Sequence, residues 1–515
     1  SLYDHLRTTA AVAVALYLYH REHGNLTVSA IKDEDETKFL FVSGDFYGIQ
    51  DFIFASGAET QRYRAKLLRG RSFAVSLITE LVADWLCREL GVPFLAVVLN
   101  AAGKFLLLAP NTAVTKEIIG RVKKEVNQWL YEISYGENSF GLSYQEVAPR
   151  QLLGGGFKEL WRTIGQNLEQ AKLTRLMPEQ FGAIKNYLEQ FRNDLPRPLC
   201  PLCGRRPSRL SGGADPYIKE VGSCCKICRD HVYLGANLVR KHRVAVVKPE
   251  AELLDSQNRL LKPLLGRYQV FFPEGQLRAL AQEGNLLHLW DISLPGSGTI
   301  RDIGRKFLNG YVPVLTREDL QDPRLAVVAE EEDLELGAPK TLQCLARLAL
   351  EVVPDSERFA GLDALGVLKA DVDNLGTLIQ EGLPPRRFSL ARLATLSRQL
   401  HFFFCFYLPN LLQQEKEFAN IYTIFAGGDD LFLLGPWREI LALARRLPQE
   451  FARYVGENPV VHLSAGVILA KAPTPIPELA AESEAALAKA KEGGKNALAI
   501  FGEVIPWTLV PALEQ

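Results

Sequence analysis

Two stretches of this sequence share one hairpin pattern. Residues 95–110 read LAVVLNAAGKFLLLAP and residues 421–436 read IYTIFAGGDDLFLLGP, and they align without a gap at an offset of 326 positions. Each has an apolar run, a turn of small residues, a second apolar run and a proline. Apolar runs on both sides of a short small-residue turn predict a β-hairpin. The chain is therefore expected to contain the same hairpin twice.

The same offset also aligns an aspartate that precedes each hairpin. Asp45, in FLFVSGDFYGIQDFIF, falls on Asp371, in LGVLKADVDNLGTLI, and each ends an apolar run that reads as a strand. A helical pattern follows each aspartate, with Phe73, Leu77, Leu81 and Trp85 at helical spacing in the first copy and RLATLSRQLHFFFCFYL in the second. The repeated unit is a strand, a helix and a hairpin. This order predicts an α+β fold with helices against one face of an antiparallel sheet, and 515 residues are too many for one core.

The two copies differ at the turn of the hairpin. The second copy has Asp429 and Asp430 where the first has Gly103 and Lys104. If the strands are neighbours, Asp371 joins the two aspartates, and three carboxylates are hard oxygen ligands for Mg²⁺ or Mn²⁺. A metal held there can act in phosphoryl transfer by the two-metal route. The alternative is a solvated acidic turn, whereas in the first copy the lysine would repel a metal.

Two further features of the second copy bear on phosphate binding. Gly427 and Gly428 allow a bulky ligand to approach the hairpin closely. Residues 479–501, LAAESEAALAKAKEGGKNALAIF, predict a helix that stops at a glycine pair and is followed by a strand. Lys491 and Lys495 near its end could reach phosphates as point charges. The alternative is a solvated helix end, where lysines also suit the helix dipole.

The cysteines predict a structural metal site. Two CxxC pairs are separated by 21 residues, and four thiolates at such spacing suit a closed tetrahedral Zn²⁺ site, formed by Cys200, Cys203, Cys225 and Cys228. Cys224 in place of Cys225, and His231 as a substitute ligand, remain open alternatives. The other cysteines lie in apolar helical stretches and are expected in the core, namely Cys87, Cys344 and Cys405.

Charge and hydropathy restrict partners and location. The net charge is −1 with 23% charged residues, so any contact with nucleic acid must be local or shared with partner proteins. One basic cluster could contact nucleotide or RNA or form a solvated, ion-paired surface: Arg62, Arg64, Lys66, Arg69 and Arg71. No apolar run reaches the roughly 18 residues of a membrane span. Without a signal peptide, and with cysteines in CxxC pairs, a cytoplasmic location is expected.

Several motifs together resemble one protein family. GGDD after an apolar strand, ADVDNLG, LSAGVILAKAPTPI and AKEGGKNALAIFGE resemble the large subunit of type III CRISPR effector complexes, in particular the Csm (III-A) form. GDFYGIQDFIF and RAKLLRGRSF look like that family's first palm domain. SLYDHLRTTAAVAVALY looks like the end of its HD nuclease domain.

The resemblance implies an activity and an assembly. Two ferredoxin-like palms of the nucleotide-cyclase and polymerase type would face each other with two ATP molecules between them. The GGDD palm would join AMP units into cyclic oligoadenylates, with release of pyrophosphate, when guide RNA in the complex pairs with target RNA. The implied partners are the other complex subunits, guide crRNA, target RNA and ATP, and no membrane. The implied cofactors are catalytic Mg²⁺ or Mn²⁺ and structural Zn²⁺.

The resemblance also implies roles for single residues. The catalytic, metal-holding residues would be Asp371, Asp429 and Asp430. The nucleotide would be bound in the second palm by Gly427, Gly428, Asp373, Asn374, Lys491 and Lys495, and in the first palm by Gly44, Asp45, Gly48 and Gln50. Tyr47 stands where the family often has a small residue, which places the neighbouring nucleotide contacts in question.

The expected domains are a remnant of the HD nuclease domain at 1–35, a first palm without GGDD at 36–150, a connector with the four-cysteine zinc site at 151–345, and the catalytic palm at 346–515. The nuclease's histidine–aspartate pair should precede Ser1, so this chain is expected to lack single-stranded DNase activity. Two other functions stay open. One is a diguanylate-cyclase-like enzyme that uses GTP, and the other is a non-catalytic scaffold that binds nucleotide or RNA.

Overall fold

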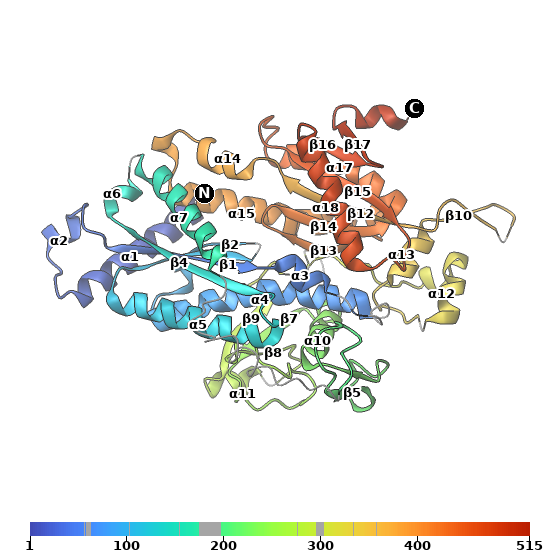
Figure 1. Cartoon of the computed structure of the whole chain (residues 1–515), viewed down its shortest axis with the longest axis horizontal. Helices are drawn as coiled ribbons and strands as arrows, with labels where there is room; N and C mark the ends of the chain where they lie inside the picture. Colours follow the sequence, from blue (N-terminus) through green and yellow to red (C-terminus); the bar gives the residue numbers. More distant parts are fainter. Residues whose placement is uncertain are drawn as a thin grey trace.

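The fold contains two ferredoxin-like sheets joined by a long helix, the first antiparallel and the second antiparallel except for the parallel pair β15 (Leu463–Ala470) and β16 (Ala497–Ile500). The structure is a computed structural model that describes residues 1–55, 57, 63–101, 103–153, 155–174, 197–275, 277–294, 303–308, 310–332, 334–356 and 358–514. The two sheets lie side by side above helix α4 (Arg64–Leu90), and the segment with the cysteines lies below it (Figure 1). This arrangement confirms the predicted α+β, multidomain fold.

The first sheet has four strands in the order β2-β3-β1-β4. They are β1 (Phe39–Tyr47), β2 (Val97–Ala101), β3 (Lys104–Pro110) and β4 (Ser139–Val147). Helix α4 and helix α5 (Ala113–Ser134) pack on the sheet, and α7 (Gly156–Leu173) contacts β1 and β4. Every residue of β1 is buried, because this apolar strand lies in the middle of the sheet with helices over it.

The second sheet repeats this order and extends it, as β13-β14-β12-β15-β16-β17. Its strands are β12 (Leu365–Val372), β13 (Tyr422–Gly427), β14 (Asp430–Pro436), β15 (Leu463–Ala470), β16 (Ala497–Ile500) and β17 (Glu503–Pro506). Helix α17 (Trp437–Tyr454) packs on one face with α15 (Leu390–Phe402), a π-helical turn at Phe403–Tyr407, and α16 (Leu408–Gln414). Helix α18 (Ile476–Glu492) packs against β12 and β15.

The predicted internal repeat is confirmed down to the strand register. Strand β3 shifted by 326 positions has the same bounds as β14. Asp45 lies opposite Lys104 in the first sheet, and Asp371 lies opposite Asp430 in the second. Even the irregularities coincide, since the register shifts between Val97 and Leu99 in one hairpin and between Thr423 and Phe425 in the other. The two hairpins are therefore equivalent in backbone geometry and differ in chemistry at their turns.

The basic cluster on α4 has a structural role, and its interpretation as a solvated surface is wrong. Arg64, Arg69 and Arg71 are all buried. Arg64 Nη1 donates to the carbonyl oxygens of Ala472 and Thr474 at 2.9 and 3.0 Å, and Arg69 Nη1 donates to the Tyr422 hydroxyl at 2.9 Å. The three acceptors belong to β13 or to the loop after β15, so these arginines tie helix α4 to the second sheet. Lys66 lies over the Tyr63 ring, and Arg62 falls outside the described residues.

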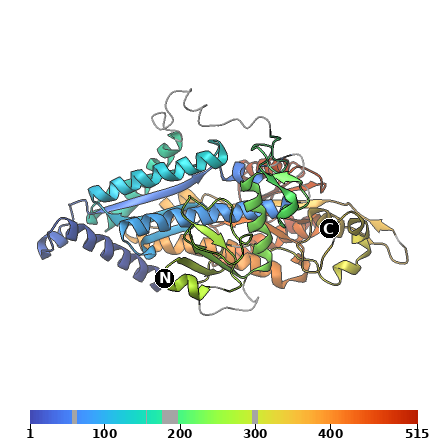
Figure 2. The same ribbon diagram turned by 90° about the horizontal axis from the view of Figure 1, so that it is seen from below.

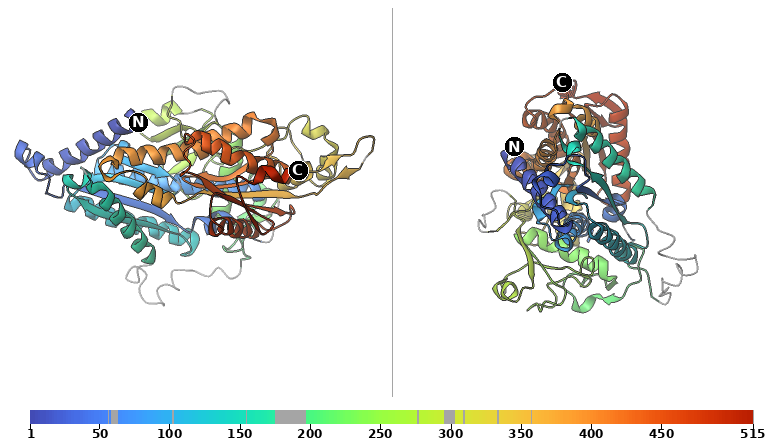
Figure 3. Two further views of the ribbon diagram at one scale, coloured as in Figure 1. Left: turned by 90° about the horizontal axis from the view of Figure 1, so that it is seen from above. Right: turned by 90° about the vertical axis from the view of Figure 1, so that its left-hand side faces the viewer.

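The N-terminal helix joins both halves. Helix α1 (Leu2–Glu22) packs against α15 and the first sheet, and it lies at the end of the molecule opposite residues 320–360 (Figure 3). The Asp4 carboxylate is buried and accepts a hydrogen bond from Arg398 Nη2 at 2.8 Å. Its hydrogen bonds to Arg398, Ser1 and Thr395 outweigh the opposing effect of burial and lower the pKa of Asp4 to about 2. This carboxylate holds two helices together. No helix in the described ranges combines the length and hydropathy needed to cross a membrane.

The connector is held on α4 by a close crossing of two helices. Helix α10 (Lys226–Arg240) crosses α4, as the view from below shows (Figure 2). Gly70 meets Gly235 at this crossing. A Cβ added at Gly70 would lie 1.8 Å from the carbonyl oxygen of His231, and one at Gly235 would lie 1.8 Å from that of Lys66. Only glycine allows backbones to approach this closely. The crossing therefore depends on both glycines.

Replacing Gly70 with alanine is expected to lower the free energy of unfolding by at least about 2 kcal/mol, since the methyl group must push two backbones apart. Differential scanning calorimetry measures the effect. The control is Gly120→Ala on α5, where a Cβ meets no atom within 4 Å. That change should raise the free energy of unfolding by about 0.5–1 kcal/mol, because alanine favours helix more than glycine does. Equal stability of the two variants would contradict the close crossing.

Candidate active site at the acidic hairpin

The acidic hairpin brings three aspartates to one edge of the second sheet. Asp371 lies near the end of β12 and is the cross-strand partner of Asp430, the first residue of β14. Asp429 lies in the turn after Gly428, which has a φ of +64° that glycine adopts without strain. The backbone nitrogen of Val372 donates to the carbonyl oxygen of Asp429 at 3.3 Å. The repeat thus places these residues side by side, as the sequence predicted.

Asp371 and Asp430 are in an environment that disfavours the charged form of their carboxylates. Burial, followed by the neighbouring Asp429 charge, raises the pKa of Asp371 to about 7. Burial also raises the pKa of Asp430 to about 6. The Oδ1 atom of Asp430 is buried and has no hydrogen-bond partner. Two half-buried carboxylates with raised pKa values, one of them with a buried oxygen that has no hydrogen-bond partner, make a site that a cation would stabilise.

The three aspartates supply oxygen ligands that suit a divalent cation, but their oxygen atoms do not all lie within 4.8 Å of one another. Oxygen ligands suit Mg²⁺ or Mn²⁺, and the unpaired Asp430 oxygen is available to one. Among the described residues, the cysteine cluster is the one group of at least three His, Cys, Asp or Glu side chains with ligand atoms all within 4.8 Å of one another. In the acidic site, Lys491 donates to Asp371 Oδ2. The Lys491 ammonium therefore neutralises the carboxylate that a metal would need.

The end of α18 and the loop after it pack against the acidic site. Lys491 lies in the last turn of α18, and Lys495 donates to the side-chain oxygen of Asn374. Lys495, Asn496 and Asn374 have positive φ values of 64°, 47° and 54°. Non-glycine residues rarely adopt this conformation, and three of them together mark a backbone held in place by its surroundings.

Asp373 holds this strained backbone in place. Its side chain is buried and accepts hydrogen bonds from the Ser464 hydroxyl at 2.8 Å and from the backbone nitrogen of Asn496 at 2.9 Å. His462 Nδ1 lies 2.7 Å from its second oxygen. Sequence reasoning missed Ser464 and His462, which are remote in sequence from the DVDN motif. The geometry favours a positioning role for Asp373 rather than direct contact with a nucleotide.

A cavity of about 590 Å³ lies between the two sheets and opens onto the acidic hairpin. Asp429, Asp430 and Lys369 line it from the second sheet, and Gly44 and Gln50 line it from the first half. Gln50 Nε2 donates to Glu484 at 3.3 Å, and Glu484 also accepts from Lys369. Glu484 of α18 thus connects Gln50 of α3 (Ile49–Phe54), in the first half, to Lys369 of β12, in the second sheet.

Two residues predicted to bind nucleotide in the first half do not line this cavity. Asp45 is buried, and burial raises its pKa to about 6. Gly48 is the N-terminal cap of a short helix, α3 (Ile49–Phe54), and its carbonyl accepts from Asn138 Nδ2 at 2.7 Å. Gly44, in contrast, lies on the cavity wall, and a Cβ there would lie 2.2 Å from the Phe105 ring. The roles of Asp45 and Gly48 remain predictions.

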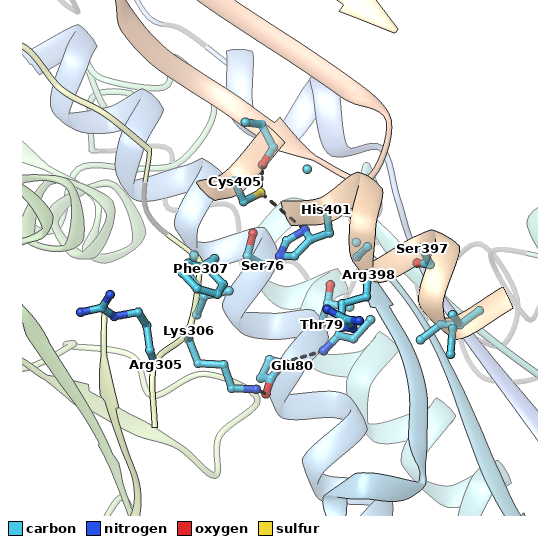
Figure 4. A pocket seen from close by; sticks show the side chains of 18 of the residues that line it. Ser76, Thr79, Glu80, Arg305, Lys306, Phe307, Ser397, Arg398, His401 and Cys405 are labelled. Carbon is cyan, nitrogen blue, oxygen red and sulfur yellow. Dashed lines mark hydrogen bonds and ion pairs between the residues drawn. The ribbon is translucent and has the colours of Figure 1, made fainter. Parts of the chain in front are cut away.

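A second cavity, of about 690 Å³, adjoins the first at the hairpin ends. Figure 4 shows Ser76, Thr79 and Glu80 of α4 facing Ser397 and His401 of α15 across it. Burial lowers the pKa of His401 to about 4, so this imidazole is neutral at pH 7. Asn100 and Lys306 both donate to Glu80. Sequence reasoning missed this cavity, because its walls come from segments that are distant in the chain.

The four predicted zinc ligands converge. The sulfur atoms of Cys200, Cys203, Cys225 and Cys228 all lie within 4.8 Å of one another, and all four residues are buried. Cys224 does not belong to the cluster, since its thiol donates to the carbonyl oxygen of Cys225 at 3.4 Å. His231 is not in the cluster either, and its ring packs against Phe52 at 5.3 Å. The two alternatives left open by the sequence therefore do not apply.

Two arginines accompany the cysteine cluster. Arg206 Nη1 lies 3.7 Å from the sulfur of Cys203, and Arg71 Nη2 lies 4.0 Å from that of Cys228. Four thiolates around Zn²⁺ carry a net charge of −2, which two guanidinium groups can offset. Arg71 belongs to α4 and also donates to the carbonyl oxygens of Ile53 and Ala55. The cluster is thereby linked to α3, which carries Gln50.

Fold and site together define a class of protein. Two ferredoxin-like sheets with the same hairpin, one of them acidic, flank a shared cavity. This is the arrangement of paired palm domains of the nucleotide-cyclase and polymerase type.

Comparisons with known proteins find similarity to one family. Residues 364–499 match the model of the Cas10/Cmr2 second palm domain, and residues 38–188 match that of Csm1 subunit domain B. The chain is similar to proteins called CRISPR system single-strand-specific deoxyribonuclease Cas10/Csm1 (subtype III-A). It is 28% identical to that of Enterococcus italicus, over 99% of this chain and 61% of the relative, and 27% identical to that of Methanocaldococcus jannaschii, over 91% and 60%. The chain is similar to these Cas10/Csm1 proteins along nearly its whole length, and it spans about 60% of their length.

Solved structures support the fold. The crystal structure of a Csm1–Csm4 subcomplex of the type III-A CRISPR-Csm interference complex matches with a TM-score of 0.71 and 22% identity, over 100% of this chain and 62% of that one. Csm1–Csm4 cassettes in complex with one ATP and with cA3 match with TM-scores of 0.70 and 0.69, at 23% and 22% identity. Each match covers 99% of this chain and 61% of the other.

Proposed function

We propose that this chain joins ATP molecules into cyclic oligoadenylates, as part of an RNA-guided type III-A effector complex. The observation that carries the proposal is the asymmetry of two equivalent hairpins that flank one cavity, since one of them has the acidic pair Asp429 and Asp430. Solved relatives with the same fold were crystallised with ATP, pppApA, pppApApA, cA3 and cA4. These ligands are a substrate, linear intermediates and cyclic products of such a reaction.

In the proposed reaction, the 3′-hydroxyl oxygen of one nucleotide attacks the α-phosphorus of the next. A phosphodiester bond forms, the bond to the β-phosphate breaks, pyrophosphate leaves, and the hydroxyl proton passes to solvent. Ring closure repeats this step within one chain, where the terminal 3′-hydroxyl attacks the α-phosphorus of its own 5′-triphosphate. The site must therefore bind two nucleotides in a fixed relative orientation.

Asp371, Asp429 and Asp430 would hold Mg²⁺ or Mn²⁺, because they supply clustered oxygen ligands of which one is unpaired. When bound, the cation supplies positive charge near the hydroxyl and the pyrophosphate. Lys491 and Lys495 would bind phosphate oxygens, and Asp373 would keep the loop of Lys495 in place. The second cavity offers Ser76, Thr79 and Ser397 as neutral hydrogen-bonding groups, together with Phe307 (Figure 4), as the recognition of a base requires.

The remaining parts of the proposal concern the whole assembly. We assign 1–35 to a remnant of the HD nuclease domain, 36–150 to the first palm, 151–345 to the connector and 346–515 to the acidic palm. We infer that the cysteine cluster of the connector holds structural Zn²⁺. The partners would be the other subunits, the guide RNA and the target RNA.

Release of pyrophosphate from ATP by the assembled complex tests the proposed reaction, with GTP as the alternative substrate. We expect ATP to be consumed at least about tenfold faster, and equal or faster use of GTP would reject the proposal.

Lys491→Met is expected to affect metal and nucleotide in opposite ways. Removing the ammonium that neutralises Asp371 should tighten Mn²⁺ binding without nucleotide by several-fold, because the carboxylate is released. The same change should raise the KM for ATP by about tenfold, because a phosphate contact is lost. Electron paramagnetic resonance of Mn²⁺ and steady-state kinetics measure the two effects. Lys489→Met, at an exposed position of the same helix, should change neither. Unchanged Mn²⁺ affinity in Lys491→Met would show that the Lys491 ammonium and the metal do not compete for the Asp371 carboxylate.

A further inference from the structure

The first hairpin carries a lysine at the position where the second carries a metal-binding aspartate. Lys104 lies opposite Asp45 in the first sheet, as Asp430 lies opposite Asp371 in the second. The two hairpins have a bulge at equivalent positions, 326 residues apart. The side chains of Lys104 and Asp430 therefore start from equivalent backbone positions. A positive charge is thus built into the first sheet at the place where the second would need a bound cation.

The surroundings of Lys104 leave its charge available to a ligand. Its Nζ lies 3.9 Å from Asp45 Oδ2, a distance for an ion pair and too long for a hydrogen bond. The Lys104 side chain is 59% exposed, whereas that of Asp45 is 4% exposed. Within the described ranges the Lys104 ammonium, which has three donors, makes no hydrogen bond. One side of the ammonium faces a buried carboxylate, and the other side is open.

The open side belongs to the cavity between the sheets. Lys104 lines the same cavity of about 590 Å³ as Asp429, Asp430 and Lys369. Glu169 of α7 is an acidic residue that lines the cavity on the same side as Lys104, and it accepts a hydrogen bond from Lys172 Nζ at 2.6 Å. Among the described residues, the first half of the cavity therefore presents an ammonium, that of Lys104, which makes no hydrogen bond, and the second half presents the carboxylates of Asp429 and Asp430. An ammonium in a partly enclosed cavity attracts phosphate oxygens.

We propose that Lys104 binds the phosphate groups of the second nucleotide without a metal ion, so that the first palm holds its triphosphate through a fixed ammonium. This inference rests on the proposed function, since it assigns one of the two nucleotides of that reaction. The two palms then differ in their dependence on divalent cations. The acidic palm needs a cation to neutralise its carboxylates before a triphosphate can approach, whereas the first palm carries the neutralising charge in its own hairpin.

The test is binding of α,β-methylene-ATP to the full chain, measured by isothermal titration calorimetry in EDTA and in Mg²⁺. The methylene bridge between its α- and β-phosphates cannot be cleaved by the proposed reaction. The wild-type chain should bind one analogue in EDTA and two in Mg²⁺. Lys104→Ala should weaken the EDTA-resistant binding by at least about tenfold, and Lys104→Arg, which keeps the charge, by no more than about threefold. Asp429→Ala with Asp430→Ala should keep the EDTA-resistant binding and lose the second event.

Lys116→Ala is the matched control, because Lys116 lies in the same half of the molecule and is paired with Glu146 at 2.5 Å. It should bind as the wild type does, and the thermal midpoints of all variants show that each is folded. Absence of binding to the wild type in EDTA, or undiminished binding to Lys104→Ala, would overturn the proposal. Product analysis separates the two proposals. A wild-type chain that keeps EDTA-resistant binding but yields no oligoadenylate rejects the reaction alone, and synthesis without such binding rejects the Lys104 site alone.

Discussion

Replacing Asp429 and Asp430 together with alanine is expected to lower the rate of oligoadenylate formation by at least about 10³-fold. The change removes two of the three carboxylates that would hold the divalent cation, including the unpaired Asp430 oxygen. Without the cation, the charge on the leaving pyrophosphate is not offset. Quantification of products by liquid chromatography from the assembled complex, with ATP and Mn²⁺, measures the effect.

Folding should survive this double change. The pKa of Asp430 is raised to about 6 by burial, above its value of about 3.8 in the unfolded chain. A carboxyl group with a raised pKa favours the folded state below pH 4 and loses this contribution as the pH rises through 6. At pH 7 its buried charge therefore opposes folding, and alanine removes the cost.

Glu478→Ala with Glu482→Ala is the matched control, since both glutamates are exposed on α18 of the same palm. It should leave the rate unchanged, and both double variants should copurify with the complex. Synthesis at the wild-type rate by Asp429→Ala with Asp430→Ala would show that the chemistry takes place elsewhere.

Cys225→Ser is expected to reduce the zinc content from one ion per chain to none and to lower the thermal midpoint by at least about 10 °C. Cys225 is one of the four clustered ligands and caps α10, where its sulfur accepts from the backbone nitrogen of Cys228 at 3.4 Å. Helix α10 crosses α4 at Gly70, and Arg71 of α4 holds the end of α3. Loss of the ion should therefore loosen the packing under the first palm. Atomic emission spectroscopy and scanning calorimetry measure the two effects.

Cys224→Ser provides the control for this prediction. Cys224 is adjacent in sequence and buried, and its sulfur is not part of the cluster. The variant should keep one zinc ion and most of the thermal stability, because only a weak thiol hydrogen bond to Cys225 changes. Loss of zinc in Cys224→Ser, or its retention in Cys225→Ser, would show that the ligand set is different.

The duplicated sheet and the acidic hairpin could be predicted from the sequence for a physical reason. Side chains in strands alternate with a period of two, so a register can be read from apolar runs, and a gap-free offset then carries every pairing from one copy to the other. The offset aligned Asp371 with Asp45 and predicted that Asp371 lies near Asp429 and Asp430 if their strands are neighbours, and β12 and β14 are paired. The cysteine cluster was predictable because four thiolates at that spacing have few other uses.

Other features depend on contacts between distant segments and leave no local pattern. The partners of Asp373 come from β15 and from the loop after α18. The second cavity is built from α4, α15 and the segment around Lys306. The arginines of α4 look like a solvated surface in sequence, but they are buried because carbonyl groups and a hydroxyl from other elements accept their hydrogen bonds. Charge along a helix shows neither which face is covered nor what covers it.

Mass spectrometry of the products formed by the assembled complex, with and without target RNA, tests the proposed activity most directly. Given ATP and Mn²⁺, the complex should release cyclic oligoadenylates and pyrophosphate in the presence of target RNA. It should release neither without target RNA, and no cyclic product from GTP. Cyclic guanylate products, or the absence of any nucleotide product from a complex that binds ATP and target RNA, would contradict the proposal that the acidic palm is an oligoadenylate synthetase.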